Sequence, residues 1–230
     1  MSLKIDRYKA LISGTEPGVL ESLLRGLLIH YFFHLSDKQI VDVSTPAPSE
    51  KKTVNLLTPT LFKGLGRIKL ASTTQFGWPA SPGSYGCSTV DARTPQAVIE
   101  FGEHTIINNG STLIAEGAGI RIGARCQIGG EALIMDSNFH EMAMGQRHLA
   151  DGSTKQVVIG DDVFIGARVT ILKGSQIGDG SVISTGAVVL GLVVPPLSIV
   201  AGNPARVMGR VPTAATVAAV TTTSTPSSDG

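Results

Sequence analysis

The sequence predicts an all-β solenoid, a parallel β-helix, because three observations agree. Aliphatic residues recur at every sixth position, a period that fits neither an α-helix nor a flat strand. Glycine directly follows three of the first four of these residues. Glycine is also abundant (27 of 230 residues) while aromatic residues make up only 5%, which suits a narrow aliphatic column better than a layered α/β core. The recurring positions are Ile159, Ile165, Ile171, Ile177, Ile183 and Val189.

Each six-residue unit, or hexad, provides one short strand and one corner, so that three hexads complete a coil. We expect the aliphatic first residue to point into the column and the glycine after it to supply corner backbone angles that a side chain resists. One coil of about 18 residues cannot bury its own inner face, so the column is stable only as a stack. The fifth positions, where a small residue must turn the corner, are Val163, Val169, Ser175, Ser181 and Ala187.

A weaker series of hexads precedes the regular one and contains a slip of three residues. Its first positions are Phe101, Ile107, Leu113, Ile122, Ile128 and Ile134. The chain then divides into five parts. They are a helical segment at 1–52, an irregular turn-rich region at 53–100 in which incomplete coils are one interpretation, coils at 101–200 interrupted by a loop at 135–157, a segment at 201–212, and a disordered tail at 213–230.

Apolar residues recur at spacings of three and four over residues 17–35, which predicts a helix beginning at Pro17. Charged residues and histidines interrupt its apolar surface. We favour packing of this helix against the column or a neighbouring subunit, with contact to a membrane surface as the alternative. A membrane span is disfavoured because it needs ~20 uninterrupted apolar residues.

Composition and charge narrow the classes of function. The net charge of +1 gives no electrostatic footprint for nucleic acid. Cys87 and Cys126 lack the spacing of metal ligands or of a redox pair, and Cys126 falls at a small corner position. We therefore expect no metal. No export signal is evident at the N-terminus, so we expect a cytoplasmic protein.

The interruption between Ile134 and Val157 is where the sequence predicts chemistry, because a solenoid that ejects one polar loop usually does so for a ligand. The loop contains His140, which is flanked by Asp136 and Glu141. A histidine can take a proton from a hydroxyl near neutral pH, and a neighbouring carboxylate raises its basicity. We therefore predict that His140 is a general base; the alternative is a loop histidine that only hydrogen-bonds.

The segment from His104 to Arg210 resembles the hexapeptide-repeat acetyltransferases, especially the sugar and polysaccharide O-acetyltransferases related to the maltose and galactoside enzymes. The resemblance implies a left-handed coil, a homotrimer, and acetyl-CoA bound between adjacent columns, with residues 201–212 on its CoA side. It is carried by INN at 107–109, DSNFHE at 136–141, VIGDDVFIGARVTILKG at 158–174 and AGNPARV at 201–207.

The same resemblance assigns roles on the acceptor side. His140 stands where the family has its loop histidine, and Glu141, or else Asp136, would support its basicity. Asn109, or else Asn108, matches the asparagine that hydrogen-bonds the acceptor sugar. Each assignment has a structural alternative: the asparagines could only form a corner, and Asp136 could only cap the loop.

On the donor side, the backbone N–H of Ala167 matches the group that faces the thioester oxygen. Thr185 and Gly186 match the coil edge along which the pantetheine arm runs. Arg206 matches the basic residue near the CoA phosphates, where a guanidinium is well suited, although it could only tie down the chain end.

Together these features predict an enzyme that moves an acetyl group from acetyl-CoA to a hydroxyl of a sugar or polysaccharide precursor. An N-acetyltransferase of a nucleotide-linked amino sugar is the first alternative. More remote alternatives are a γ-type carbonic anhydrase, with His104, His140 and His148 on zinc, and a non-catalytic scaffold.

Overall fold

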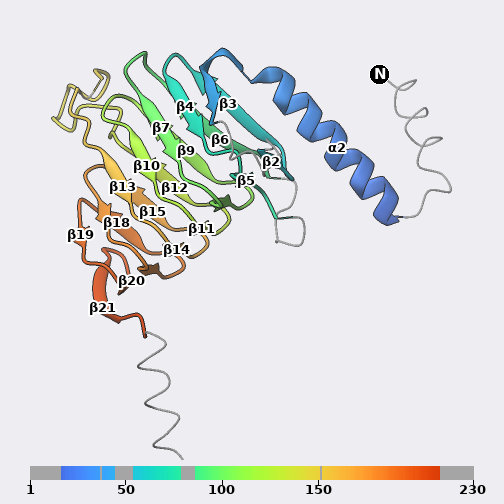
Figure 1. Ribbon diagram of the computed structural model, residues 1–230. Coiled ribbons are helices and arrows are strands. Elements are labelled where there is room, and N and C mark those ends of the chain that lie inside the picture. The colour runs from blue at the N-terminus through green and yellow to red at the C-terminus, as the bar shows by residue number, and fades with distance from the viewer. Residues whose placement is uncertain (1–16, 37, 45–53, 79–85, 151, 213–230) are drawn as a thin grey trace, which may run out of the picture.

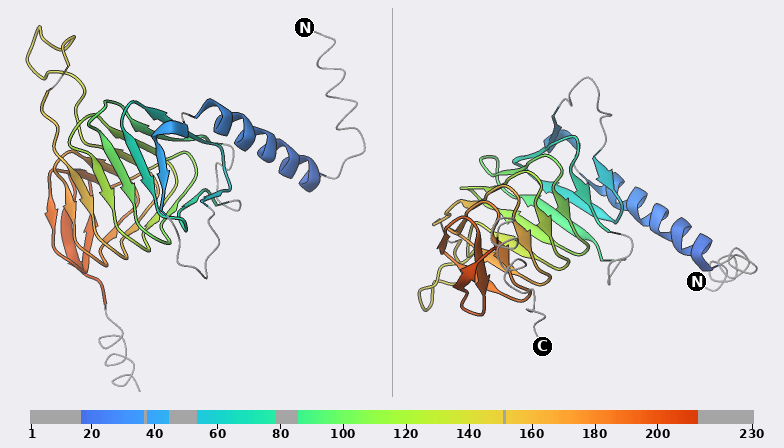
Figure 2. Two further views of the ribbon diagram at one scale, coloured as in Figure 1. Left: turned by 45° about the horizontal axis from the view of Figure 1, so that its top comes forward. Right: turned by 60° about the horizontal axis from the view of Figure 1, so that its bottom comes forward.

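The computed structural model describes residues 17–36, 38–44, 54–78, 86–150 and 152–212. The described chain begins with helix α2 (Pro17–Leu35) and the short 3-10 helix η1 (Lys38–Ile40), and then winds into a three-sided column of short strands (Figures 1 and 2). The predicted tail at 213–230 lies outside the described residues.

The column has three sheets, one on each side, and all their strand pairs are parallel except the last one in sheet B. Sheet A contains β1 (Val41–Val43), β4 (Arg67–Leu70), β7 (Val98–Phe101), β10 (Ile120–Ile122), β13 (Val157–Ile159), β16 (Gln176–Ile177) and β19 (Val193–Val194). Sheet B contains β2 (Asn55–Leu56), β5 (Gln75–Phe76), β8 (Ile106–Ile107), β11 (Gln127–Ile128), β14 (Phe164–Ile165), β17 (Val182–Ile183), β20 (Ser198–Ala201) and the antiparallel β21 (Arg206–Arg210). Sheet C contains β3 (Thr60–Gly64), β6 (Ser88–Ala92), β9 (Thr112–Ala115), β12 (Leu133–Met135), β15 (Thr170–Leu172) and β18 (Val188–Leu190).

The chain visits sheets A, B and C in turn, so every third strand pairs with the strand one coil below it. This is the predicted parallel β-helix, and its winding is left-handed. The first residues of the regular hexads, Ile159 to Val189, are at most 3% exposed and stack in register on their counterparts in neighbouring coils. The five predicted corner residues are also buried.

The glycine at the second position of the hexad serves a different purpose from the one predicted. Positive φ angles fall instead at the fourth position, at residues such as Arg125 (56°), Asp162 (55°) and Gly180 (65°). The second-position glycine is required because coils approach closely there. A Cβ on Gly160 would lie 2.0 Å from Oδ1 of Asp179.

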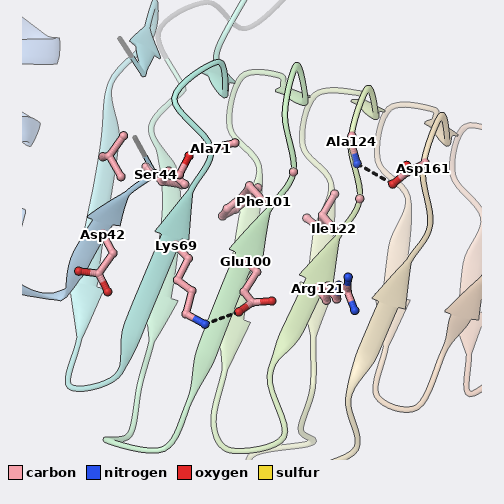
Figure 3. Close-up of a pocket in the computed structure, with 14 residues that line it drawn as sticks. Asp42, Ser44, Lys69, Ala71, Glu100, Phe101, Arg121, Ile122, Ala124 and Asp161 are labelled. Atoms are coloured by element: carbon pink, nitrogen blue, oxygen red, sulfur yellow. Dashed lines mark hydrogen bonds and ion pairs between the residues drawn. The ribbon is translucent and has the colours of Figure 1, made fainter. Parts of the chain in front are cut away.

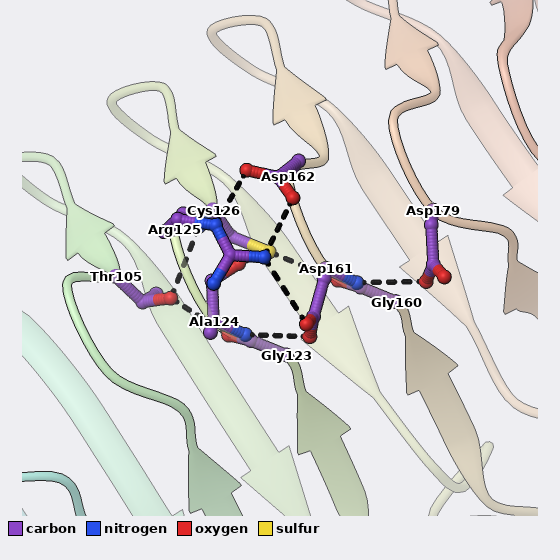
Figure 4. Close-up of polar contacts among 9 residues, drawn as sticks. All are labelled: Thr105, Gly123, Ala124, Arg125, Cys126, Gly160, Asp161, Asp162 and Asp179. Atoms are coloured by element: carbon purple, nitrogen blue, oxygen red, sulfur yellow. Dashed lines mark hydrogen bonds and ion pairs between the residues drawn. The ribbon is translucent and has the colours of Figure 1, made fainter.

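A ladder of aspartates explains this close approach (Figure 4). Oδ1 of Asp161 accepts the N–H of Ala124 at 2.9 Å, and Oδ1 of Asp179 accepts the N–H of Asp161 at 2.9 Å. Arg125 adds an ion pair to Asp162 at 2.7 Å, which joins the same two coils. Corner side chains therefore connect one coil to the next, and the glycine leaves them room.

The region predicted to be irregular at 53–100 differs from that expectation, since its described residues form β2 to β7 and wind as regular coils. The six-residue period is difficult to recognise in this part of the sequence because longer connections separate the strands. The inner positions are also larger: the rings of Phe62 and Phe101 both pack edge-on against Phe76, at 5.3 and 5.5 Å between centroids.

Helix α2 has the predicted limits but projects away from the column and contacts it through β3 (Figures 1 and 2). Ser36 joins the two, because its Oγ accepts the N–H of Phe62 at 3.0 Å and donates to the carbonyl of Phe32 at 3.0 Å. Large apolar side chains remain exposed along the helix, including Leu27 at 61% and Tyr31 at 58%. Among the described residues, no helix has the length and apolarity that crossing a membrane requires.

Candidate functional site

The ejected loop occupies residues 136–156, between β12 of sheet C and β13 of sheet A. Asp136 is fully buried at its base. Its carboxylate accepts the backbone N–H groups of Glu116 at 2.7 Å, Gly117 at 3.0 Å and Gly119 at 2.7 Å. Asp136 therefore caps the turn at residues 116–119, whereas the structural alternative expected it to cap its own loop, and both of its carboxylate oxygens are engaged there.

A second set of contacts fixes the start of the loop just before His140. The guanidinium of Arg93 lies 4.6 Å from the ring centroid of Phe139, and it pairs with Asp91 at 3.3 Å. The N–H of Phe139 donates to Oγ of Ser137 at 2.9 Å, and Phe139 itself has a positive φ of 65°. The chain thus enters the exposed part of the loop in a defined direction.

Beyond Phe139 the loop forms an exposed finger. His140 is exposed and pairs antiparallel with Ala150, while the N–H of the half-buried Glu141 donates to the carbonyl of Leu149 at 3.1 Å. The tip carries apolar side chains in solvent, with Met144 exposed at 93%. His140 and Glu141 therefore sit together on a finger that extends away from their own column.

The outer face of sheet B carries a groove of about 400 Å³, which we call the sheet B groove. It holds three residues predicted from the resemblance, namely Asn108, Ala167 and Thr185. Two exposed aromatic side chains, Trp78 and Phe164, also line it, at 50% and 49% exposure. The remaining lining residues are Ile106, Gln127, Ile128, Gly129, Ile165 and Gly166.

The backbone N–H of Ala167 differs from its equivalents at the corner between sheets A and B, but resembles those of Gly130 and Thr185, which occupy its own corner in the adjacent coils and also have no acceptor among the described residues. At the same hexad position, the N–H groups of Ala124 and Asp161 donate to aspartate side chains. For Ala167, the described part of the chain supplies no acceptor. Gly186 lies one coil further on, and its N–H donates to the carbonyl of Ala167 at 3.0 Å. A Cβ on Gly186 would meet no atom within 4 Å, so the coil edge there is open.

Asn109 does not face the groove as an open hydrogen-bonding group. It is 2% exposed, its Oδ1 accepts the N–H of Trp78 at 2.9 Å, and its Nδ2 donates to the carbonyl of Trp78 at 3.2 Å. The amide is thus engaged with Trp78, a groove residue that the sequence analysis missed. A signal was available, because Trp78 is the single tryptophan of the chain.

Arg206 lies at the start of β21, on the same sheet as the groove. Its side chain is exposed, and Nη1 donates to the carbonyl of Ala205 at 2.8 Å. The order β14-β17-β20-β21 in sheet B places it beyond the groove, on the side of Thr185. Ala167, Thr185 and Arg206 therefore follow one line along the column.

One chain does not bring His140 to this line. The finger leaves the column between sheets C and A, whereas the groove lies on sheet B, and His140 is absent from the residues that line the groove. Figure 1 shows the finger (yellow) and β11 and β14 at opposite sides of the column. Within one chain, the predicted donor-side and base-side residues are separate.

A second hollow, of about 470 Å³, lies on the outer face of sheet A and contains none of the predicted site residues (Figure 3). Charged side chains line it, and two of them, Lys69 and Glu100, form an ion pair at 2.5 Å. Arg121 and Asp161 stand further along the same face. The residues that line this hollow include no histidine and none of the predicted site residues, which leaves the sheet B groove as the better candidate.

Among the described residues, the two cysteines and the histidines form no second candidate site, either as a cysteine nucleophile or as a metal site. Burial raises the pKa of the Cys126 thiol, and burial likewise raises that of Cys87, so both are poor nucleophiles near neutral pH. In the described parts of one chain, no three side chains of histidine, cysteine or carboxylate type gather as a metal site would require. His104, His140 and His148 are thus apart within a single copy.

Fold and site together define a left-handed β-helix built of hexapeptide repeats, with an ejected histidine loop and a groove on one sheet. Residues 156–191 match the family model described as bacterial transferase hexapeptide (six repeats). The chain is 32% identical over 148 residues to YvoF of Bacillus subtilis (strain 168), whose name suggests an acetyltransferase, and the match covers 64% of this chain and 63% of that protein. Over its repeat region, the chain is similar to the hexapeptide-repeat transferases.

Two further comparisons are more partial. Serine acetyltransferase 4 of Arabidopsis thaliana is 37% identical over 99 residues, which are 43% of this chain and 26% of that protein. The crystal structure of the polysialic acid O-acetyltransferase OatWY matches with a TM-score of 0.52 at 19% identity, covering 74% of this chain and 84% of the other, and this supports the fold. The chain thus spans less than two thirds of the curated relatives' lengths.

Proposed function

We propose that this protein transfers an acetyl group from acetyl-CoA to a hydroxyl of a sugar or polysaccharide precursor, at a site completed between neighbouring copies. The observation that carries the proposal is the sheet B groove, where the N–H of Ala167 has no acceptor among the described residues and Thr185 and Arg206 continue the line. The names of YvoF and of serine acetyltransferase support the acetyl group as the one transferred.

The donor side follows from the chemistry of the groove. A backbone N–H held rigidly by the column is suited to the negative charge that develops on a thioester oxygen, since it needs no reorganisation during the reaction. The open coil edge at Gly186 leaves room for a narrow chain such as pantetheine. Arg206 offers a guanidinium to phosphate at the far end.

His140 supplies the base. The acceptor oxygen forms a bond to the acetyl carbonyl carbon as its proton passes to the imidazole, the carbon–sulfur bond breaks, and the proton is then delivered to the leaving sulfur. Glu141, the adjacent carboxylate on the finger, is the better partner for the imidazole. Asp136 has its carboxylate committed to three backbone N–H groups.

The separation of finger and groove within one chain supports a shared site. A homotrimer would set the finger of one copy against sheet B of the next, and closed cyclic symmetry repeats this contact at every interface. The exposed Met142 and Met144 at the finger tip suit burial against a second copy, because large apolar side chains gain stability when they leave water.

The test is a screen of sugar acceptors with isotopically labelled acetyl-CoA, read by mass shift, on wild type, His140→Ala and His148→Ala. We expect His140→Ala to lower kcat by about 10² to 10⁴ while acetyl-CoA affinity stays near that of wild type, as for loss of a general base. His148, another exposed histidine of the same loop, is the matched control and should keep its rate.

Turnover of His140→Ala close to wild type would remove this residue from the mechanism. Absence of transfer to every sugar by the wild type would reject the sugar-acetylating activity. Labelled product on an amino group instead of a hydroxyl would redirect the proposal to N-acetylation.

A further inference from the structure

Asn109 and Trp78 form a contact whose purpose goes beyond holding the fold together. They are 31 residues apart, and the amide of Asn109 bonds to both backbone polar groups of Trp78. The next residue back is fixed as well, since the N–H of Gly77 donates to the carbonyl of Ile107 at 2.7 Å and its carbonyl accepts from Nε2 of Gln75 at 3.0 Å. The column thus holds the backbone of residues 77–78 from several directions.

The backbone of Trp78 is fixed, but its side chain is half exposed. The indole lines the sheet B groove, although a tryptophan contributes most to folding stability when it is buried. A large aromatic surface on an immobilised backbone loses little further conformational entropy when a ligand covers it, so it is well suited to binding.

The position of Trp78 relative to Ala167 identifies the ligand. Trp78 follows β5, and the order β5-β8-β11-β14 puts three strand spacings, about 14 Å, between its strand and that of Ala167. Arg206 lies in the opposite direction along the same sheet. If the acetyl donor extends from Ala167 towards Arg206, Trp78 stands at the acceptor end of the groove, further from the reacting hydroxyl than one sugar ring reaches.

We propose that Trp78 is a platform for a sugar ring of an oligosaccharide acceptor, one or more units away from the ring that is acetylated, and that Asn109 is its positioning residue. The electron-rich face of the indole attracts the C–H face of a pyranose, and Nε1–H can donate to a hydroxyl. The inference rests on the proposed function and deepens it, because it selects an oligosaccharide or polysaccharide over a free monosaccharide.

Kinetics with acceptors of increasing length test the platform. Two series serve as probes: glucose, maltose and maltotriose, and N-acetylneuraminic acid with its dimer and trimer. In the series that the wild type acetylates, kcat/KM should rise with length. Trp78→Ala should lower kcat/KM for the trimer about tenfold and for the monomer by less than about twofold, while Trp78→Phe keeps most of the rise. Tyr31→Ala, which removes an exposed aromatic residue of α2, is the control and should change neither value.

A binding measurement gives a readout that does not depend on activity. Trp78 is the chain's only tryptophan, so indole emission reports on this position alone. We expect the trimeric sugar of one series to shift the emission of the wild type and acetyl-CoA to leave it unchanged. Emission that responds to acetyl-CoA instead, or to no sugar, would overturn the platform.

The outcomes separate the two proposals. If the wild type acetylates sugars and Trp78→Ala weakens monomer and trimer equally, the platform fails and the proposed function stands. If the wild type acetylates no sugar, the proposed function fails, and the emission titration with the same sugars still decides whether Trp78 binds them.

Discussion

The carboxylate of Asp136 has no exposed surface and accepts three backbone N–H groups from the turn at residues 116–119. A buried donor that loses its acceptor costs the protein the full desolvation of that group. The turn explains the slip of three residues between Leu113 and Ile122, since it inserts extra chain whose N–H groups at residues 116, 117 and 119 donate to this carboxylate.

Asp136→Ala should therefore destabilise the fold. We expect the free energy of unfolding to fall by about 2–4 kcal/mol, measured by urea denaturation. The control is Glu103→Ala, which removes an exposed carboxylate. Equal stability of the two variants would contradict the capping role.

Arg206 tests the donor side of the proposed site. Arg206→Ala should raise the KM for acetyl-CoA about tenfold with little change in kcat, because a charge-assisted contact to phosphate is lost from binding alone. Arg67→Ala, an exposed arginine on sheet A, is the control. An unchanged KM in Arg206→Ala would show that Arg206 does not bind the CoA phosphates and only ties down the chain end.

At the scale of the hexad, glycine and aspartate of successive coils form a coupled pair. Gly160→Ala would place a Cβ against Asp179, so one coil must shift relative to the next. We expect a loss of about 1–3 kcal/mol, seen as a lower Tm. Gly152→Ala is the matched control, because a Cβ there meets nothing within 4 Å. Equal Tm values for the two variants would show that neighbouring coils can accommodate the added Cβ without loss of stability.

The ion pair of Arg125 with Asp162 belongs to the same corner. Hydrogen bonding to the guanidinium lowers the pKa of Asp162. A carboxyl group whose pKa is lower in the folded state contributes stability above its unfolded pKa, and that stability is lost as the pH falls through its folded pKa.

Arg125→Gln should thus return the pKa of Asp162 towards its usual range and make stability depend less on pH in the acid range. The carboxyl resonance of Asp162, followed by NMR through an acid titration, measures this. Both groups are exposed, so the change in stability should be small. A pKa that stays low in the variant would assign the effect to another group.

At the scale of the whole molecule, the proposed site needs two copies. His140→Ala removes the finger's base, and Thr185→Trp fills the groove of the other copy; each variant alone should be nearly inactive. After the two are unfolded and refolded together, a trimer should recover about a quarter of the wild-type rate, since one interface in about four pairs an intact finger with an intact groove. No recovery would place the whole site within one chain.

The parts of the column that could be predicted from the sequence are those in which the six-residue period is recognisable. The hexads from Ile159 to Val189 predicted the column directly, because the aliphatic first residue of each hexad fills one inner position. Between residues 54 and 100 the sequence predicted only an irregular region, with incomplete coils as one interpretation, since Phe62 and Phe76 fill the column at spacings that longer connections obscure. The limits of α2 were predicted correctly, whereas its exposed leucines show that sequence did not reveal what it packs against.

The candidate site divides in the same way. The family resemblance assigned Asn108 to the acceptor, and Ala167 and Thr185 to the cofactor. All three line one groove, and their roles there stay predictions. Trp78 was missed, because it reaches the groove through a bond to an asparagine 31 residues away.

The sequence by itself determined the repeat, the inner and outer faces of each hexad and the place where the chain leaves the column, since all three depend on contacts between residues close in the chain or at a fixed period. The tertiary structure decided what Asn109 and Asp136 do and how far His140 lies from the groove. Those outcomes depend on which polar groups of distant segments meet, and a buried amide or carboxylate bonds to whichever backbone groups the folded coils bring to it.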